Sequence, residues 1–122
     1  MLSNFLNDNL FSVYANSNKI FIETESQKYS FREFDDLINK ISNLLVTSGL
    51  NKGDRVLVKL EKSVFSFALY ISTIRAGGIF IPVNTDYTAS EIDYFIDNSM
   101  PSIFISNDQS LKDVQNRNLK TF

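Results

Sequence analysis

The sequence has 122 residues, of which 43% are hydrophobic and 21% charged, a balance typical of one folded globular domain rather than a disordered or fibrous chain. Twelve Lys and Arg against fourteen Asp and Glu leave a net charge of −2, so we expect neither nucleic acid nor a membrane as a partner. The absence of Cys and His excludes disulfides, thiol nucleophiles, Ser-His-Asp triads, imidazole bases and zinc sites with nitrogen or sulfur ligands.

The N-terminal residues predict a helix followed by a hairpin. Apolar residues recur at helical spacing from Asn4 to Ala15, which favours a short amphipathic helix. The sequence has no apolar run of about 18 residues and no signal-peptide pattern, so we expect a cytoplasmic location. The segment from Ile20 to Glu25 is typical of a strand, and Ser26-Gln27 would turn it into a short partner, Lys28 to Ser30.

Ser30 begins the clearest helix signal in the sequence. Ser30 and Glu33 have the spacing of a capping box, in which each side chain accepts a hydrogen bond from the other residue's backbone N–H. Apolar residues then recur every three or four positions as far as Leu45, which predicts one core-facing stripe. The opposite side carries the carboxylates of Asp35 and Asp36, and we expect that side to be solvated.

The second half of the chain alternates strands and helices. One predicted helix is apolar on nearly all sides and therefore needs neighbours all round. The strand that follows it is a continuous apolar run, typical of a strand buried on both faces of a parallel sheet. Thr88 and Glu91 form a second capping-box signal. The predicted elements are a strand Arg55 to Leu60, a helix Val64 to Ala76, a strand Ile79 to Val83, a helix opened by Thr88, and a strand Ser102 to Ser106.

These elements predict an α/β fold, in which an N-terminal helix and a β-hairpin are followed by a β-α-β-α-β parallel-sheet unit. We assign residues 1–106 to the domain. Residues 107–122 are mostly polar and predict a loosely structured tail or a short helix.

The four glycines argue against a self-contained nucleotide site. Gly49, Gly53, Gly77 and Gly78 precede strands, whereas phosphate-binding glycines lie between the end of a strand and the next helix. The sequence contains neither GxGxxG nor GxxxxGK[ST].

Two strand-to-helix turns carry polar residues at the edge of the sheet where ligands of open α/β folds bind. In Glu61-Lys62-Ser63, Lys62 would suit an ion or a phosphate, but a helix cap at Ser63 explains the same residues and is favoured. The segment Asn84 to Thr88 would suit the wall of a ligand channel, and Thr88 as a cap with Tyr87 as a packing ring explains it nearly as well.

Several motifs, in order, resemble the N-terminal region of adenylate-forming acyl-CoA synthetases. The resemblance covers about residues 5 to 110, and agreement of several spaced motifs is more specific than any one of them. The turn after the first sheet strand and the segment around Asn84 look most like those of malonyl-CoA synthetases. The matching segments are Tyr29-Ser30-Phe31-Arg32-Glu33-Phe34, Gly49 to Val56, Glu61-Lys62-Ser63, Leu69-Tyr70, Ile74 to Gly78, Pro82 to Thr88, and Glu91 with Asp93 to Ile96.

The resemblance implies the large N-terminal domain of an enzyme that converts ATP and a carboxylate, here malonate, into an acyl adenylate and pyrophosphate. The thiol of CoA then displaces AMP to form the thioester, and Mg²⁺ assists the first step. Family members are several times longer, and their phosphate loop, acidic motifs and C-terminal Lys have no counterpart in this sequence. The resemblance therefore assigns no catalytic and no metal-binding residue, and we expect the chain by itself to bind no cofactor and to be inactive.

For the ligand site, the resemblance implies that Asn84, Thr85 and Tyr87 lie close to CoA. A loop shaped only for packing is the alternative. Two hypotheses for the partner follow. The chain is one part of a split or truncated synthetase, whose remaining part supplies the sites for ATP, Mg²⁺ and CoA. Alternatively, it is a non-catalytic interaction module or remnant that binds another protein through an uncovered apolar face.

Overall fold

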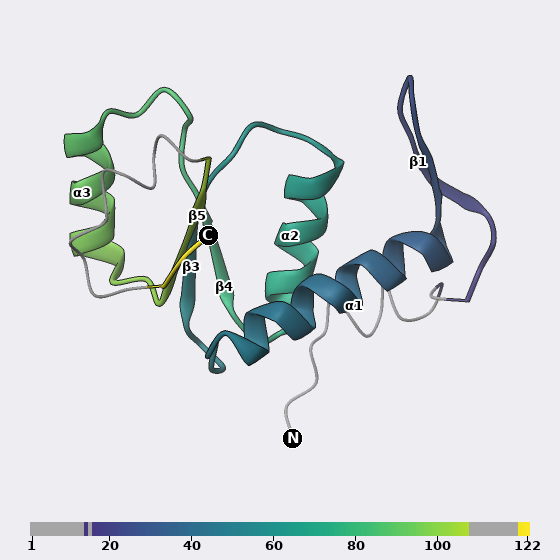
Figure 1. The fold of residues 1–122 in the computed structure, drawn as a ribbon, viewed down its shortest axis with the longest axis horizontal. Helices are drawn as coiled ribbons and strands as arrows, with labels where there is room; N and C mark the ends of the chain where they lie inside the picture. The colour runs from purple at the N-terminus through teal and green to yellow at the C-terminus, as the bar shows by residue number, and fades with distance from the viewer. Residues whose placement is uncertain (1–13, 15, 108–119) are drawn as a thin grey trace.

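The computed structural model describes residues 14, 16–107 and 120–122, and a four-stranded parallel sheet lies at its centre (Figure 1). Its strands are β3 (Arg55–Lys59), β4 (Ile79–Pro82), β5 (Ile103–Ser106) and β6 (Lys120–Thr121), in the order β4-β3-β5-β6. Each neighbouring pair is parallel. The predicted α/β class and parallel sheet are therefore confirmed.

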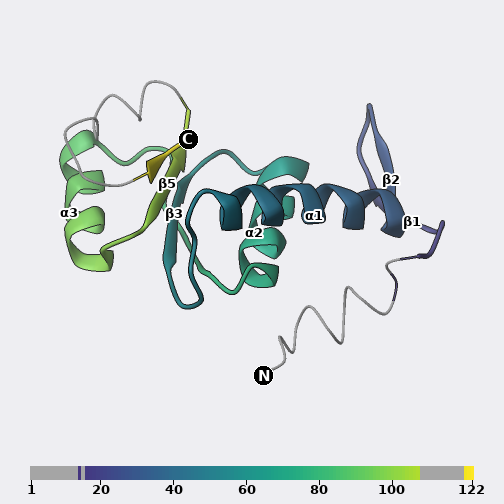
Figure 2. The same ribbon diagram turned by 60° about the horizontal axis from the view of Figure 1, so that its bottom comes forward.

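Helices cover both faces of this sheet. Helices α1 (Phe31–Thr47) and α2 (Val64–Arg75) lie on one face, and α3 (Ala89–Ser99) lies on the other. Figure 2 shows α1 crossing α2. Helix α1 packs mainly on α2, and α2 lies between most of α1 and the sheet. The larger core lies on the α1 and α2 side and includes Phe34, Ile38, Leu45, Val56, Leu69 and Ile103; the smaller core, on the α3 side, consists of Leu57, Ile92, Ile96 and Phe104 with its half-buried neighbours.

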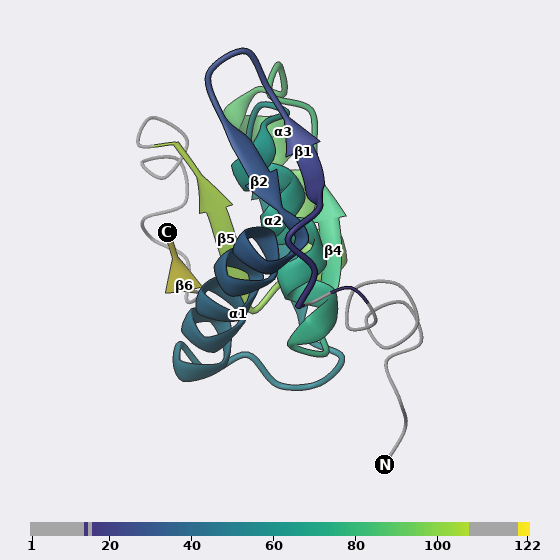
Figure 3. The same ribbon diagram turned by 90° about the vertical axis from the view of Figure 1, so that its right-hand side faces the viewer.

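A hairpin of β1 (Ile20–Glu23) and β2 (Lys28–Ser30) packs against the N-terminal end of α1 (Figure 3) and lies away from the sheet, as Figure 1 shows. The ring of Phe21 stacks on Phe31 with centroids 4.5 Å apart and lies 5.3 Å from Phe34. The hairpin and α1 are therefore joined by aromatic packing.

The predicted start of α1 is confirmed. Ser30 Oγ accepts a hydrogen bond from the Glu33 N–H at 3.1 Å, and Glu33 Oε1 accepts one from the Ser30 N–H at 3.1 Å. Gly49, just beyond the helix, has a φ of 105°, a left-handed conformation that favours glycine.

The structure corrects the expectation for the apolar strand Ile79 to Val83. Its main part, β4, is the outer strand of the sheet, and Ile79 is 49% exposed. The strands buried along most of their length are β3 and β5. A run of apolar residues indicates a buried strand only if other strands pair on both sides, and the described residues place a strand on one side of β4 alone.

Two local expectations also need correction. The capping box expected at Thr88 is half formed: Thr88 Oγ1 accepts from the Glu91 N–H at 3.3 Å, but the same hydroxyl, rather than the Thr88 backbone N–H, donates to Glu91 Oε1 at 3.2 Å. Asp35 does not lie on a solvated face. Its carboxylate forms an ion pair with Arg75 at 2.7 Å, and its side chain is only 18% exposed, so it fastens α1 to α2.

The N-terminal prediction lies mostly outside the described residues, and the C-terminal residues form a strand that was not predicted. The helix expected from residue 4 to 15 lies outside the described residues, apart from Tyr14. No strand was expected after Ser106, because Lys120 and Thr121 belong to no apolar run, yet these two residues pair with β5 as β6. The domain boundary at residue 106 stays a prediction. Within the described part of the chain, no helix has the length and apolar character needed to cross a membrane.

Candidate functional site

The carboxyl edge of the sheet carries the two turns that the sequence singled out. Because β3 and β4 are parallel, the turn from β3 into α2 and the turn from β4 into α3 leave the sheet at the same edge. In open α/β sheets this edge is where ligands bind. The two turns nevertheless lead to opposite faces, since α2 and α3 belong to different cores.

The turn after β3 is explained by helix capping. Ser63 Oγ accepts a hydrogen bond from the Ser66 N–H at 3.1 Å, and Ser66 Oγ accepts one from the Ser63 N–H at 2.8 Å. Each serine therefore satisfies a backbone donor that the first turn of α2 leaves without a helical partner. The favoured interpretation of Ser63 as a helix cap is confirmed.

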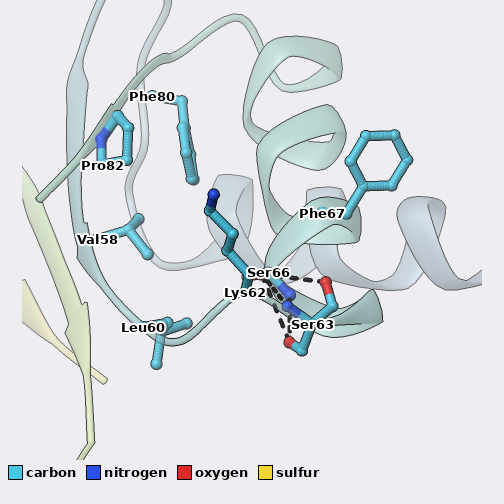
Figure 4. A pocket seen from close by; sticks show the side chains of 8 residues that line it. All are labelled: Val58, Leu60, Lys62, Ser63, Ser66, Phe67, Phe80 and Pro82. Carbon is cyan, nitrogen blue, oxygen red and sulfur yellow. Dashed lines mark hydrogen bonds between the residues drawn. The ribbon is translucent and has the colours of Figure 1, made fainter. Parts of the chain in front are cut away.

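A pocket of about 310 Å³ opens beside this turn, between β3, β4 and the start of α2 (Figure 4). Its walls are mostly apolar, and the two serines at its rim already bond each other's backbone. Lys62 is exposed and extends along the pocket from the turn. Such a pocket suits an apolar group and offers no nucleophile with an adjacent base. It is lined by Val58, Leu60, Lys62, Ser63, Ser66, Phe67, Phe80 and Pro82.

The loop from Asn84 to Thr88 lies on the α3 side and does not line this pocket. Asn84 shapes the loop, because its Oδ1 accepts from the Asp86 N–H at 2.9 Å and its backbone oxygen accepts from the Tyr87 N–H at 3.1 Å. The Tyr87 ring stacks on Phe95 of α3, with centroids 5.1 Å apart and planes 9° from parallel. Thr85 is half-buried. The structure thus accounts for Asn84 and Tyr87 through folding, and their closeness to CoA stays a prediction.

Sequence reasoning missed one residue of this loop's surroundings. Lys59, the last residue of β3, is only 9% exposed, and its Nζ donates to the Tyr87 backbone oxygen at 3.0 Å. The available signal was a Lys at the end of the run Val56 to Val58, where a strand inside a parallel sheet favours apolar residues.

The described residues do not fit ATP or Mg²⁺ as a complete site. The N-termini of α2 and α3 are capped by the side chains of Ser63 and Thr88. The glycine turns lie at the amino edge instead, where the Gly53 N–H donates to the Gly77 oxygen at 2.8 Å. Within the described ranges, no group of three acidic, His or Cys side chains is arranged to hold a metal ion.

The comparison that decides the family covers nearly the whole chain. The family model described as "AMP-binding enzyme" matches residues 12–121. The chain belongs to this family of AMP-binding enzymes. Its fold agrees, because the structure superposes on ATP-bound MatB from Rhodopseudomonas palustris with a TM-score of 0.91 and 34% identity over 98% of the chain. The resemblance to adenylate-forming enzymes is thereby confirmed.

Two further relatives are similar to this chain at lower identity. A crotonobetaine/carnitine--CoA ligase from Escherichia coli O127:H6 is 27% identical over 105 residues, which is 84% of this chain and 20% of the ligase. Gramicidin S synthase 1 from Brevibacillus brevis is 24% identical over 89 residues, which is 73% of this chain and 8% of the synthase. The match to MatB covers 25% of that protein. The chain therefore spans a quarter or less of the relatives named here.

Proposed function

We propose that this chain is the N-terminal part of an AMP-forming carboxylate–CoA ligase, a malonyl-CoA synthetase, and that it acts only together with the rest of the fold. The assembled enzyme would convert ATP, malonate and CoA into malonyl-CoA, AMP and pyrophosphate. ATP, Mg²⁺ and CoA belong to that assembly. The chain alone is inactive in this proposal.

One observation carries the proposal. The chain superposes along 98% of its length on MatB, yet it corresponds to 25% of the MatB chain. The same sheet and helices therefore form in a protein four times as long, where ATP is bound. Since the described residues contain no phosphate loop and no metal cluster, the remaining part of such a protein must supply the groups that bind the nucleotide.

Malonate as the acid rests on two further similarities. The segments Glu61-Lys62-Ser63 and Pro82 to Thr88 resemble those of malonyl-CoA synthetases, and MatB is 34% identical to this chain. The crotonobetaine/carnitine--CoA ligases, at 27% identity, support the broader class of carboxylate–CoA ligases.

The surface around α2 and β4 is suited to receive the remaining polypeptide. Tyr70 meets Phe80 edge to face with ring centroids 5.1 Å apart, and Phe67 lines the pocket beside Phe80. Although they are large and apolar, Phe67 and Tyr70 are 39% and 37% exposed. We call Phe67, Tyr70 and Phe80 the α2–β4 face. Contiguous apolar surface of this kind marks an interaction site, and the occupant we propose is the rest of an adenylate-forming domain.

The test is reconstitution. The purified 122-residue chain is assayed for malonate-dependent pyrophosphate release, alone and mixed with the polypeptide encoded next to it. We expect no release from the chain alone and AMP formation by the mixture that requires both malonate and CoA. Acetate replaces malonate as the control acid.

Each result has a clear meaning. Turnover by the lone chain contradicts the proposal. Turnover by the mixture with acetate but not malonate retains the ligase class and rejects malonate. Binding of the neighbouring polypeptide without turnover favours the non-catalytic interaction module.

The role of the α2–β4 face is tested with two matched variants. Tyr70→Lys places a charge on the face, and Leu44→Lys places one on the exposed side of α1, where Leu44 is 54% exposed. We expect Tyr70→Lys to weaken association at least about tenfold and Leu44→Lys to leave it unchanged, because desolvating an unpaired charge opposes binding. Equal effects of both variants would exclude this face.

A further inference from the structure

Lys59 is the feature of the carboxyl edge that capping and core packing leave unexplained. Lysine is almost never fully buried unless its charge is paired, yet this side chain is only 9% exposed. Neither of the ion pairs among the described residues, Glu23 with Lys28 and Asp35 with Arg75, involves it. Its described hydrogen bond goes to the Tyr87 backbone oxygen, 28 residues further along the chain.

The two ends of this contact lie on different kinds of element, a central strand and a loop. Lys59 ends β3, which is paired with β4 on one side and β5 on the other, and its own backbone oxygen accepts a hydrogen bond from Ser106 Oγ at 3.2 Å. Tyr87 lies in a connecting loop. A charged donor on a central strand therefore holds the carbonyl of a loop residue in place, and hydrogen bonds of this charged type are stronger than neutral ones.

The contact complements those made by the loop itself. The side-chain and backbone oxygens of Asn84 accept hydrogen bonds from the N–H groups of Asp86 and Tyr87, respectively. Phe95 stacks on the Tyr87 ring. Lys59 donates to the other backbone polar group of Tyr87, its carbonyl. Backbone and ring of Tyr87 are thus fixed from three elements: its own loop, α3 and β3.

We infer that Lys59 is a positioning residue that fixes the loop Asn84–Thr88 at the carboxyl edge in the orientation in which Tyr87 meets its ligand. The first part of this inference, that Lys59 fixes the loop, does not depend on a bound ligand. The second part, that the ligand is CoA, rests on the proposed function. Lys59 itself touches no reacting atom in this inference.

The first experiment needs no activity. Hydrogen exchange of the Asp86 and Tyr87 amides is measured in the full 122-residue chain carrying Lys59→Met, which keeps an apolar stem and removes the donor. We expect exchange about tenfold faster at these two amides, as loss of a hydrogen bond to a charged group implies, and unchanged exchange in α1. Lys40→Met, at an exposed position of α1, is the matched control and leaves both regions unchanged.

A conservative variant separates positioning from general packing. Lys59→Arg retains a charged donor and is expected to restore slow exchange in the loop. If Lys59→Met does not fold, Lys59→Gln takes its place, because its amide is too short to reach the Tyr87 oxygen. Unchanged loop exchange in the variant without the donor, or equal acceleration in the loop and in α1, overturns the inference.

A second experiment links the loop to its ligand in the reconstituted enzyme. We expect Lys59→Met to raise KM for CoA about tenfold, to leave malonate-dependent pyrophosphate formation from ATP unchanged, and to be rescued by Lys59→Arg. Failure of reconstitution counts against the proposed function alone, since the exchange experiment is independent of it. Active enzyme with an unchanged KM for CoA counts against this loop as the CoA contact.

Discussion

The strands β4 and β5 begin with the same three residues, Ile-Phe-Ile, but differ in burial and in register. In β5 all four residues are buried, whereas in β4 both end residues are exposed and the middle two are half-buried. The cause is their place in the sheet: β5 lies between β3 and β6, and β4 is the outer strand. Burial of a strand is therefore a property of its neighbours rather than of its own sequence.

Register separates the two strands further. Val56 of β3 pairs with Phe80 of β4 and with Ile103 of β5, so the two Ile-Phe-Ile segments are offset by one residue relative to β3. An offset of one residue turns side chains to the opposite face. Phe80 accordingly packs on the α2 side, and Phe104 is buried in the smaller core beneath α3.

The largest expected difference comes from placing a charge at the first residue of each strand. Ile103→Lys buries an ammonium where the native side chain is 1% exposed, and we expect a loss of at least about 4 kcal/mol in the free energy of unfolding. Ile79→Lys, at 49% exposure, should cost less than about 1 kcal/mol. Urea unfolding followed by circular dichroism measures both, and similar losses would show that β4 is as buried as β5.

Truncating the two phenylalanines sharpens the comparison at the cores. Phe104 is fully buried, so Phe104→Ala should lower the free energy of unfolding by about 3 to 5 kcal/mol. Phe80 is half-buried, and Phe80→Ala should cost about 1 to 2 kcal/mol. The measurement is the shift in urea midpoint at constant slope. A larger loss for Phe80 would contradict the assignment of β4 to the edge.

The fourth residue of each strand gives the smallest difference. The Ile79 and Val83 N–H groups donate to the Asp54 and Val58 oxygens, so alternation turns the nitrogen of Pro82 toward the other side, where the described residues place no strand and a missing N–H costs little. Pro82→Ser should change stability by less than about 0.5 kcal/mol. The Ser106 N–H instead donates to the Phe122 oxygen at 2.9 Å, and Ser106→Pro should cost about 1 to 3 kcal/mol. Thermal unfolding tests the pair, and a tolerated Ser106→Pro would argue against the pairing of β5 with the C-terminal residues.

At the candidate site, local motifs were predictable and long-range contacts were not. Ser63 and Thr88 were identified as caps because a cap depends on residues three positions apart, although Thr88 forms only half of its box. The loop Asn84–Thr88 was placed at the carboxyl edge because parallel strands share that edge. The bond from Lys59 to Tyr87 could not be foreseen, since it joins residues 28 positions apart. The same holds for the ion pair of Asp35 with Arg75.

The sequence by itself determined the order of strands and helices from β1 to β5, the caps, the glycine turns and the α/β class, because each depends on residues close together in the chain. Only the tertiary structure decided which Ile-Phe-Ile segment is buried, which face each phenylalanine joins, and which side of α2 is left open. Those outcomes depend on pairing partners and register, which two identical three-residue segments cannot specify by themselves.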